Sequence, residues 1–329
     1  MQTLYPLQFI PVYKQYVWGG KKLREIYRRV DAPSPCSEAW EVTDRDDGMS
    51  IVSAGPLRGT TLRQLMEERG EEIAGSRWKR NAKNLVFPVL VKIIDAGERL
   101  SIQVHPDEES ARRYGGEPKT EMWYVLDAEP EAYVYAGFNR IIDTAALERS
   151  LKDGSIESIL NKIPLKIHTA IYVPGGRVHA IGGGCLLLEI QQNSNTTYRL
   201  YDWNRVDKSG KSRPLHIEQA IHAIRWHDDS PLSLQPVLQE KSQAHTIWEI
   251  LTCPYFSVKR IELSDGKEIK HNGESCHIVF VVSGRVNIEG GLIPASISAG
   301  TTSLIPAGMK RYIMSPVSSS CVLLDITLV

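Results

Sequence analysis

The sequence has no excess of charge of either sign. Its 329 residues include 39 Lys and Arg and 39 Asp and Glu, so the formal net charge is zero. Long-range attraction to nucleic acid or to an anionic membrane needs a basic excess, so we expect neither kind of partner. The longer apolar runs, such as residues 85–91, fall far short of the roughly 20 residues that span a bilayer. Residues 1–20 lack the apolar region and cleavage site of a signal peptide, and we expect a cytoplasmic protein.

Closely spaced cysteine pairs are absent as well. The chain has an odd number of cysteines with no C-x-x-C pair: Cys36, Cys185, Cys253, Cys276 and Cys321. Disulfide frameworks and thiolate zinc sites need paired or clustered cysteines, so we exclude both and expect ordinary buried thiols. Apolar residues make up 42% of the composition, which is enough for packed cores and excludes a disordered chain.

Helical periodicity is limited to two short segments. Residues 60–69 begin with two threonines, which are good N-caps, and residues 143–151 begin with Asp and Thr; both place apolar residues at helical spacing. Elsewhere, short runs rich in Val, Ile and Tyr lie between turn residues, as at 132–136, 170–173 and 186–190. This pattern is typical of strands, so we expect a mainly β protein.

The last third of the chain predicts strands only. Strand-like segments follow one another at 245–251, 256–263, 277–288, 302–305 and 321–328. The Pro- and Ser-containing segment 230–236 is the best candidate for a linker. We therefore predict a first domain of residues 1–235 with a few helices, and a smaller all-β domain of residues 236–329.

Three of the predicted strands carry side chains suited to a metal ion. Gln103 and His105 are two residues apart, so on a strand both side chains leave the same face. Glu121 lies in a second strand-like segment, and a turn at residues 174–176 leads to His179 on a third. The spacing resembles the two signatures of the cupin superfamily, G-x5-[H/Q]-x-H followed by Glu, and P-x-G-x2-H. The matching residues are Gly97, Gln103, His105, Glu121, Pro174, Gly176 and His179.

The cupin resemblance implies two jelly-roll β-barrels, the first with a metal site. Gln103, His105, Glu121 and His179 would offer a divalent first-row ion two imidazoles, one carboxylate and one amide oxygen, with a position left for water or substrate. Pure oxygen ligation would instead have indicated magnesium or calcium. The amide in place of a third imidazole lowers the basicity at the metal, so we favour zinc over iron, with one ion per chain.

Longer phrases of the sequence closely resemble type I mannose-6-phosphate isomerases of the short bacterial kind. They are residues 18–20 (WGG), 37–41 (SEAWE), 100–107 (LSIQVHPD) and 173–181 (VPGGRVHAI). The resemblance implies a zinc enzyme that interconverts mannose 6-phosphate and fructose 6-phosphate, with the four residues above as metal ligands. The partner would be a small hexose 6-phosphate, and the protein a monomer or small homo-oligomer.

The same resemblance assigns catalytic roles. The family's active-site lysine, carboxylate and arginine fall on Lys119, Glu189 and Arg199. We expect Glu189 to move the carbon proton through an enediol intermediate, Lys119 to serve the oxygens, and Arg199 to stabilise anionic charge. The residues alone leave the base open among Glu189, Lys119 and a histidine.

Substrate-binding residues are implied in the same way. Lys92 and Ser101 match positions at the family's phosphate-binding end. Arg205 stands where some relatives have a lysine, and its reach differs from that of lysine. Trp18 is a candidate for stacking on the sugar, although a core role is an equal alternative.

The second domain repeats part of the signature. Residues 306–308 form a P-x-G turn, but Arg311 stands where the metal-binding histidine would be. His271 and His277 do not complete a ligand pattern. We therefore expect a second cupin-like barrel that holds no metal and has a structural role.

Three other functions compete with this assignment, one of which is a related isomerase that acts on another phosphorylated sugar. An Fe(II) cupin oxygenase also uses two His and one carboxylate, but the amide ligand and the cations Lys92, Lys119, Arg199 and Arg205 disfavour it. A non-catalytic sugar-phosphate-binding cupin would need neither Glu189 nor Lys119.

Overall fold

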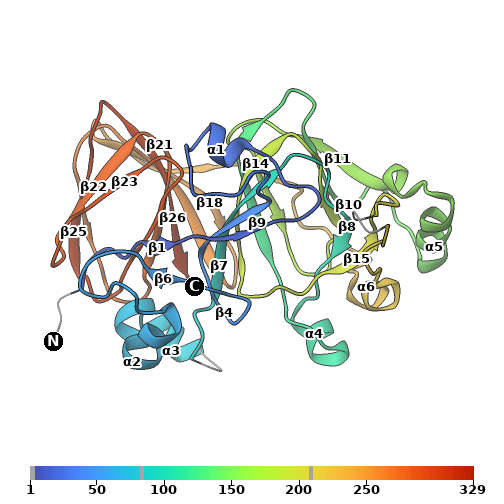
Figure 1. Cartoon of the computed structure of the whole chain (residues 1–329), viewed down its shortest axis with the longest axis horizontal. Helices are drawn as coiled ribbons and strands as arrows, with labels where there is room; N and C mark the ends of the chain where they lie inside the picture. Colours follow the sequence, from blue (N-terminus) through green and yellow to red (C-terminus); the bar gives the residue numbers. More distant parts are fainter. Residues whose placement is uncertain (1–3, 82–84, 207–209) are drawn as a thin grey trace. The chain divides into compact units, whose positions relative to one another are not determined.

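The computed structural model describes residues 4–81, 85–206 and 210–329. Antiparallel strands form most of its regular structure, and the helices are short (Figure 1). The mainly β fold class predicted from the sequence is confirmed. The chain divides into two compact units. We call residues 13–39 with 92–234 the central unit, and residues 1–12, 40–91 and 235–329 the terminal unit.

Two sheets carry the strands of the central unit, and neither closes into a barrel. Residues 12, 40–42 and 89–91 of the seven-stranded sheet are grouped with the terminal unit. The seven-stranded sheet has the order β16 (Ser233–Leu234), β12 (Ala170–Val173), β9 (Glu121–Ala128), β14 (Cys185–Gln192), β7 (Val89–Ala96), β3 (Glu38–Val42) and β2 (Val12–Lys14). The five-stranded sheet has the order β11 (Leu160–Pro164), β10 (Tyr133–Phe138), β13 (His179–Ile181), β8 (Ile102–Val104) and β15 (Tyr198–Tyr201). Together they make a two-sheet, cupin-like sandwich.

Alternation along the strands divides the apolar residues of the central unit between two clusters. In β10, Val134 belongs to the cluster that also takes Ile94 and Trp123 from the seven-stranded sheet, so this cluster fills the space between the sheets. Tyr135 belongs instead to a cluster with Leu147 and Ala220 on the other face. Successive strand residues point to opposite faces, so one face supports the sandwich and the other is covered by helices.

The helices that cover the five-stranded sheet are α5 (Thr144–Asp153), the 3-10 helix η1 (Ile156–Ile159) and α6 (Ile217–Ala223). The central unit also contains α1 (Lys22–Glu25) and α4 (Glu108–Tyr114). The side chain of Asp143 accepts the N–H of Ala146 and caps α5, so the helix predicted at 143–151 is confirmed. No helix of the described segments is long and apolar enough to cross a membrane.

The terminal unit also contains two open sheets. The six-stranded sheet has the order β17 (Val237–Lys241), β18 (His245–Thr252), β19 (Phe256–Leu263), β26 (Cys321–Leu328), β21 (His277–Ser283) and β24 (Thr302–Ile305). The four-stranded sheet has the order β20 (Lys267–Lys270), β25 (Arg311–Pro316), β22 (Arg285–Glu289) and β23 (Ala295–Ser298). Two short pairs join β1 (Phe9–Ile10) to β6 (Ile51–Val52), and β4 (Asp44–Arg45) to β5 (Gly48–Met49).

Two helices belong to the terminal unit, α2 (Leu62–Ala74) and α3 (Ser76–Asn81). Thr61 and Gln64 form a reciprocal capping box at the start of α2. The helix predicted at 60–69 is therefore confirmed, with an additional turn at its C-terminal end.

The two units differ from the predicted division into residues 1–235 and 236–329. One transition between the units does fall at residue 235, but residues 1–12 and 40–91 are grouped with the C-terminal strands. The reason is long-range pairing: the N–H of Ala307 donates to the carbonyl of Ile73, and that of Cys276 donates to the carbonyl of Ala74. Periodicity along the chain carries no information about such pairs.

Some polar side chains of the terminal unit contact one another. Arg311, at the start of β25, forms an ion pair with Glu268. Nδ1 of His277 lies 2.8 Å from Asp325, and the rings of His271 and His277 meet edge to face with centroids 4.7 Å apart.

Candidate active site

The four predicted metal ligands lie together between the two sheets of the central unit. Gln103 on β8 is directly opposite His179 on β13. His105 follows β8, and Glu121 begins β9 on the facing sheet. One ligand atom from each of His105, Glu121 and His179 lies within 4.8 Å of the other two, and this is the one such group found in the described part of the chain.

A glycine turn brings His179 to this position. The N–H of Gly176 donates to the carbonyl of His105, and Gly176 has a φ of 90°. A Cβ on Gly175 would lie 2.7 Å from the Cα of Asp107. The turn thus packs directly against the backbone that follows His105, and only glycine permits this approach.

The spacing of the ligand atoms fits a tetrahedral metal ion. Nε2 of His105 is 3.4 Å from Glu121 Oε2, and Nε2 of His179 is 3.5 Å from Glu121 Oε1. The amide nitrogen of Gln103 is 3.3 Å from Nε2 of His179, and a 180° turn of the amide would put its oxygen there. Ligands at about 2.0–2.2 Å in a tetrahedron are about 3.3–3.6 Å apart, so the set fits a divalent first-row ion such as zinc.

Both imidazoles are held in the state that binds metals. Burial lowers the pKa of His105 to about 3 and also lowers the pKa of His179. Nδ1 of His179 donates to the carbonyl of Arg177 at 2.8 Å, which leaves the lone pair of Nε2 facing Glu121. Burial alone would raise the pKa of Glu121, but Lys119 and the two histidines hold it well below the usual value.

A buried chain of opposite charges lies beside this cluster. Nζ of Lys92 is 3.1 Å from Glu189 and 3.2 Å from Glu38. Nζ of Lys119 is 3.7 Å from Glu189 and 3.2 Å from Glu121. Burial, reinforced by Glu121, raises the pKa of Glu189 although Lys92 and Lys119 oppose the effect. A carboxylate with a raised pKa is suited to proton transfer.

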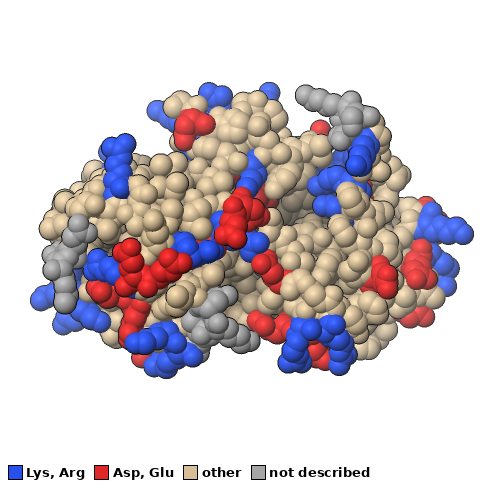
Figure 2. All heavy atoms as spheres, turned by 60° about the horizontal axis from the view of Figure 1, so that its bottom comes forward, with Lys and Arg blue, Asp and Glu red and all other residues tan. Residues whose placement is uncertain are grey.

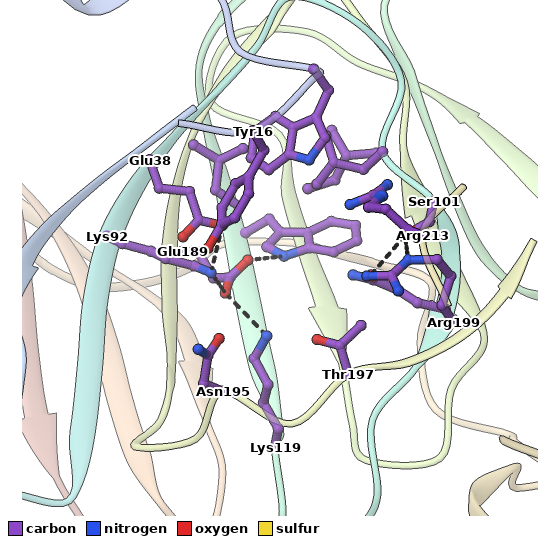
Figure 3. Close-up of a pocket in the computed structure, with 16 residues that line it drawn as sticks. Tyr16, Glu38, Lys92, Ser101, Lys119, Glu189, Asn195, Thr197, Arg199 and Arg213 are labelled. Carbon is purple, nitrogen blue, oxygen red and sulfur yellow. Dashed lines mark hydrogen bonds and ion pairs between the residues drawn. The ribbon is translucent and has the colours of Figure 1, made fainter. Parts of the chain in front are cut away.

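Guanidinium groups lie at the other end of the same pocket, as Figure 3 shows. Arg199 on β15 is directly opposite Gln103, so both side chains leave the same face of the sheet. Nε of Arg199 donates to Ser101 at 3.3 Å, and another nitrogen donates to the carbonyl of Pro214 at 2.8 Å.

The pocket has a volume of about 260 Å³, which suits a small ligand rather than a polymer. It is lined by Tyr16, Trp18, Glu38, Lys92, Ile94, Leu100, Ser101, Gln103, Lys119, Trp123, Ile181, Glu189, Asn195, Thr197, Arg199 and Arg213. All of these residues belong to the central unit.

Comparison with known proteins identifies the family. A model of the phosphomannose isomerase type I catalytic domain matches residues 6–139. Mannose-6-phosphate isomerase ManA of Bacillus subtilis is 33% identical over 94% of this chain and 96% of its own. The mannose-6-phosphate isomerase of Streptococcus mutans is 34% identical over 90% of each chain. The chain belongs to the type I phosphomannose isomerase family.

The fold agrees with this membership. The crystal structure of the mannose 6-phosphate isomerase from Bacillus subtilis superposes with a TM-score of 0.88 at 31% identity, over 98% of this chain and 99% of that one. The resemblance found in the sequence is thus confirmed, and the chain is an enzyme of the phosphomannose isomerase family.

In this phosphomannose isomerase family member, most of the predicted residues meet in the pocket. Gln103, Lys119, Glu189 and Arg199 line it, and so do the predicted substrate-binding residues Lys92, Ser101 and Trp18. Trp18 is also a core residue, only 3% exposed. Its ring stacks on that of Tyr16, with the ring centroids 5.5 Å apart.

The predicted ligands His105, Glu121 and His179 lie beside Lys119 but are not part of this lining, and neither is Arg205. Its guanidinium donates to Asp202 and to the carbonyl of Arg99 instead. Arg213 lines the pocket instead. Four further residues of the lining, Tyr16, Glu38, Asn195 and Thr197, were likewise not predicted from the sequence. Glu38 had a signal, since it lies in the family phrase 37–41. Arg213 had no comparable motif.

Proposed function

We propose that this chain is a zinc-dependent aldose–ketose isomerase that interconverts mannose 6-phosphate and fructose 6-phosphate through an enediol intermediate. The observation that carries the proposal is a pocket lined by Gln103, Lys119 and Glu189, in which Lys119 links Glu189 to Glu121 of the buried cluster His105, Glu121 and His179. Family membership and the names of the relatives support the substrate.

One zinc ion per chain would be held by Gln103, His105, Glu121 and His179. When bound, it would supply Lewis-acid chemistry that polarises the carbonyl of the open-chain sugar. The separation of ligand atoms and the neutral imidazoles support this assignment.

Glu189 is our candidate for the base that carries the proton between C2 and C1. Its carboxylate is oriented on both sides, because Nε1 of Trp123 donates to Oε2 at 3.0 Å and Lys92 lies against Oε1. A base held in this way needs little reorganisation as the proton moves. Lys119, beside both Glu189 and Glu121, would exchange protons with the sugar oxygens.

The opposite end of the pocket would hold the substrate's negative charge. Arg199 would stabilise anionic charge, and Ser101 lies within its hydrogen-bond reach. Trp18 would form part of the wall along the sugar. The central unit would thus be the catalytic part and the terminal unit a metal-free structural part. A cytoplasmic location and a monomer or small homo-oligomer complete the proposal on sequence grounds.

A coupled assay of mannose 6-phosphate conversion tests this function. Protein stripped with a chelator should lose activity and regain it with zinc, but His105→Ala should neither bind zinc nor turn over. His222→Ala is the matched control, because His222 is exposed and stacks on Tyr114 away from the pocket. Zinc binding without turnover in wild-type protein would instead support the sugar-phosphate-binding alternative, and oxygen consumption with iron the oxygenase.

A further inference from the structure

One buried carboxylate organises two of the arginines near the pocket. Asp202 accepts two hydrogen bonds from Arg213, from Nε at 2.8 Å and from a terminal nitrogen at 2.5 Å. It also accepts one at 2.5 Å from Arg205. The Asp202 side chain is 6% exposed. A fork-to-carboxylate contact of this kind fixes the plane of a guanidinium group.

Only one of these two arginines reaches the pocket. Arg213 lines it together with Arg199, Ser101 and Thr197 (Figure 3). Arg205 is turned toward the carbonyl of Arg99 and is absent from the lining.

The charges at this end do not balance. Asp202 is the one carboxylate that ion-pairs with Arg205 and Arg213 in the described residues. The side chain of Arg199 donates to neutral groups, the hydroxyl of Ser101 and the carbonyl of Pro214. Among the residues that the structure describes, these three guanidinium groups therefore share a single negative charge. The excess matches the charge of a phosphate monoester, which is close to −2 at neutral pH.

The lysine-rich side of the pocket has no such excess. Lys92 lies between the carboxylates of Glu38 and Glu189, and Lys119 lies between Glu189 and Glu121. Each ammonium is already matched by carboxylates, so a phosphate placed there would meet negative charge.

We propose that Arg213, oriented by Asp202, binds the phosphate of the substrate together with Arg199, and that Arg205 serves only to support Asp202. The inference rests on the proposed function, because it names the residue that anchors the phosphorylated end of the hexose. Arg213 presents a planar fork with fixed orientation, which is the geometry that binds phosphate through two parallel hydrogen bonds.

The test compares Arg213→Gln with Arg205→Gln in the zinc-loaded enzyme. We expect Arg213→Gln to raise KM for mannose 6-phosphate and Ki for inorganic phosphate at least about tenfold, with kcat changed by less than about threefold, since the lost contact is made to ground state and transition state alike. Arg205→Gln should change KM and Ki less than Arg213→Gln. Arg213→Lys should fall between wild type and Arg213→Gln, because the charge remains and the fork is lost. Arg112→Gln, on the exposed face of α4, controls for loss of a surface charge.

Two results would overturn the proposal: a larger rise of KM and Ki in Arg205→Gln than in Arg213→Gln, or a loss of kcat in Arg213→Gln with KM and Ki unchanged. If Arg213→Gln does not fold, as judged by thermal unfolding, Arg213→Lys decides in its place.

Failure of the proposed function is separable from failure of this inference. If wild-type protein does not turn over mannose 6-phosphate, calorimetry with inorganic phosphate still compares wild type with Arg213→Gln. Weaker binding by Arg213→Gln would support the assignment of Arg213, and equal binding would refute it.

Discussion

Trp123 and Glu189 are direct cross-strand partners on β9 and β14, and the indole N–H of Trp123 donates to Oε2 of Glu189 at 3.0 Å. The register of the sheet thus places a neutral donor opposite the proposed base. Both side chains are buried, so this hydrogen bond is protected from competition with water.

Trp123→Phe should lower kcat about tenfold, because it removes a hydrogen bond to a charged group and leaves the carboxylate less well oriented. Steady-state kinetics with mannose 6-phosphate checks this. Trp226→Phe is the matched control, since Trp226 stacks on Phe138 outside the pocket. Equal kinetics for the two variants would show that the indole N–H has no part in the reaction.

Lys92→Met should destabilise the fold by about 3 kcal/mol, because Glu38 and Glu189 would lose the cation between them in a buried site. Urea unfolding of the apo-protein measures the change. The double variant Glu38→Gln/Lys92→Met should lose less free energy of unfolding than the two single variants lose in sum, since Glu38 and Lys92 form one ion pair. Strict additivity would contradict this coupling.

Asp95→Asn tests a pH effect away from the pocket. Burial raises the pKa of Asp95 to about 6, although the N–H of Leu23 donates to it. A carboxyl group whose pKa is higher in the folded than in the unfolded chain favours folding most when it is protonated. Its contribution to stability is therefore complete below about pH 4 and is lost as the pH rises to 6.

Relative to wild type, Asp95→Asn should therefore gain roughly 2 kcal/mol of stability between pH 4 and pH 7. Thermal unfolding of both proteins over this range measures the difference. A difference that does not change with pH would show that the pKa of Asp95 is the same in the folded and the unfolded chain.

Gly175→Ala should lower zinc affinity about tenfold or more, although Gly175 is not a ligand. The new Cβ would clash with the backbone of Asp107 and displace the turn that leads to His179. Zinc content after dialysis against a weak chelator gives the result. Gly266→Ala, where the nearest atom is the side-chain oxygen of Ser315 at 3.1 Å, is the control. Full zinc retention by Gly175→Ala would show that the turn is not needed to position His179.

The sequence predicted features that depend on neighbouring residues. Thr61 and Asp143 predicted the starts of α2 and α5, because a capping residue before a periodic segment is a local signal. Helix α4 was missed although Asp107 and Ser110 form a capping box, since its seven residues bury only Ser110 and Ala111 and show no apolar stripe.

Features set by pairing between distant parts of the chain could not be predicted from the sequence. Residues two apart on a strand share a face, so Gln103 and His105 could be predicted as ligands from the sequence. The exchange of Arg205 for Arg213 depends on how both arginines share Asp202, and no spacing rule encodes that. The grouping of residues 40–91 with the last strands is of the same kind.

The hydrogen bond between the hydroxyl of Ser303 and the carbonyl of Leu7 joins residues 296 positions apart. On the ribosome, the first strands and α2 emerge while their partners in β21 and β24 are still unmade. The central unit is fully synthesised by residue 234, but the terminal unit stays incomplete until the last strand, β26, leaves the exit tunnel. Nascent chains stalled before β21 would therefore lack these partners of Leu7 and α2, and the interval until β24 has emerged is when the protein most needs a chaperone.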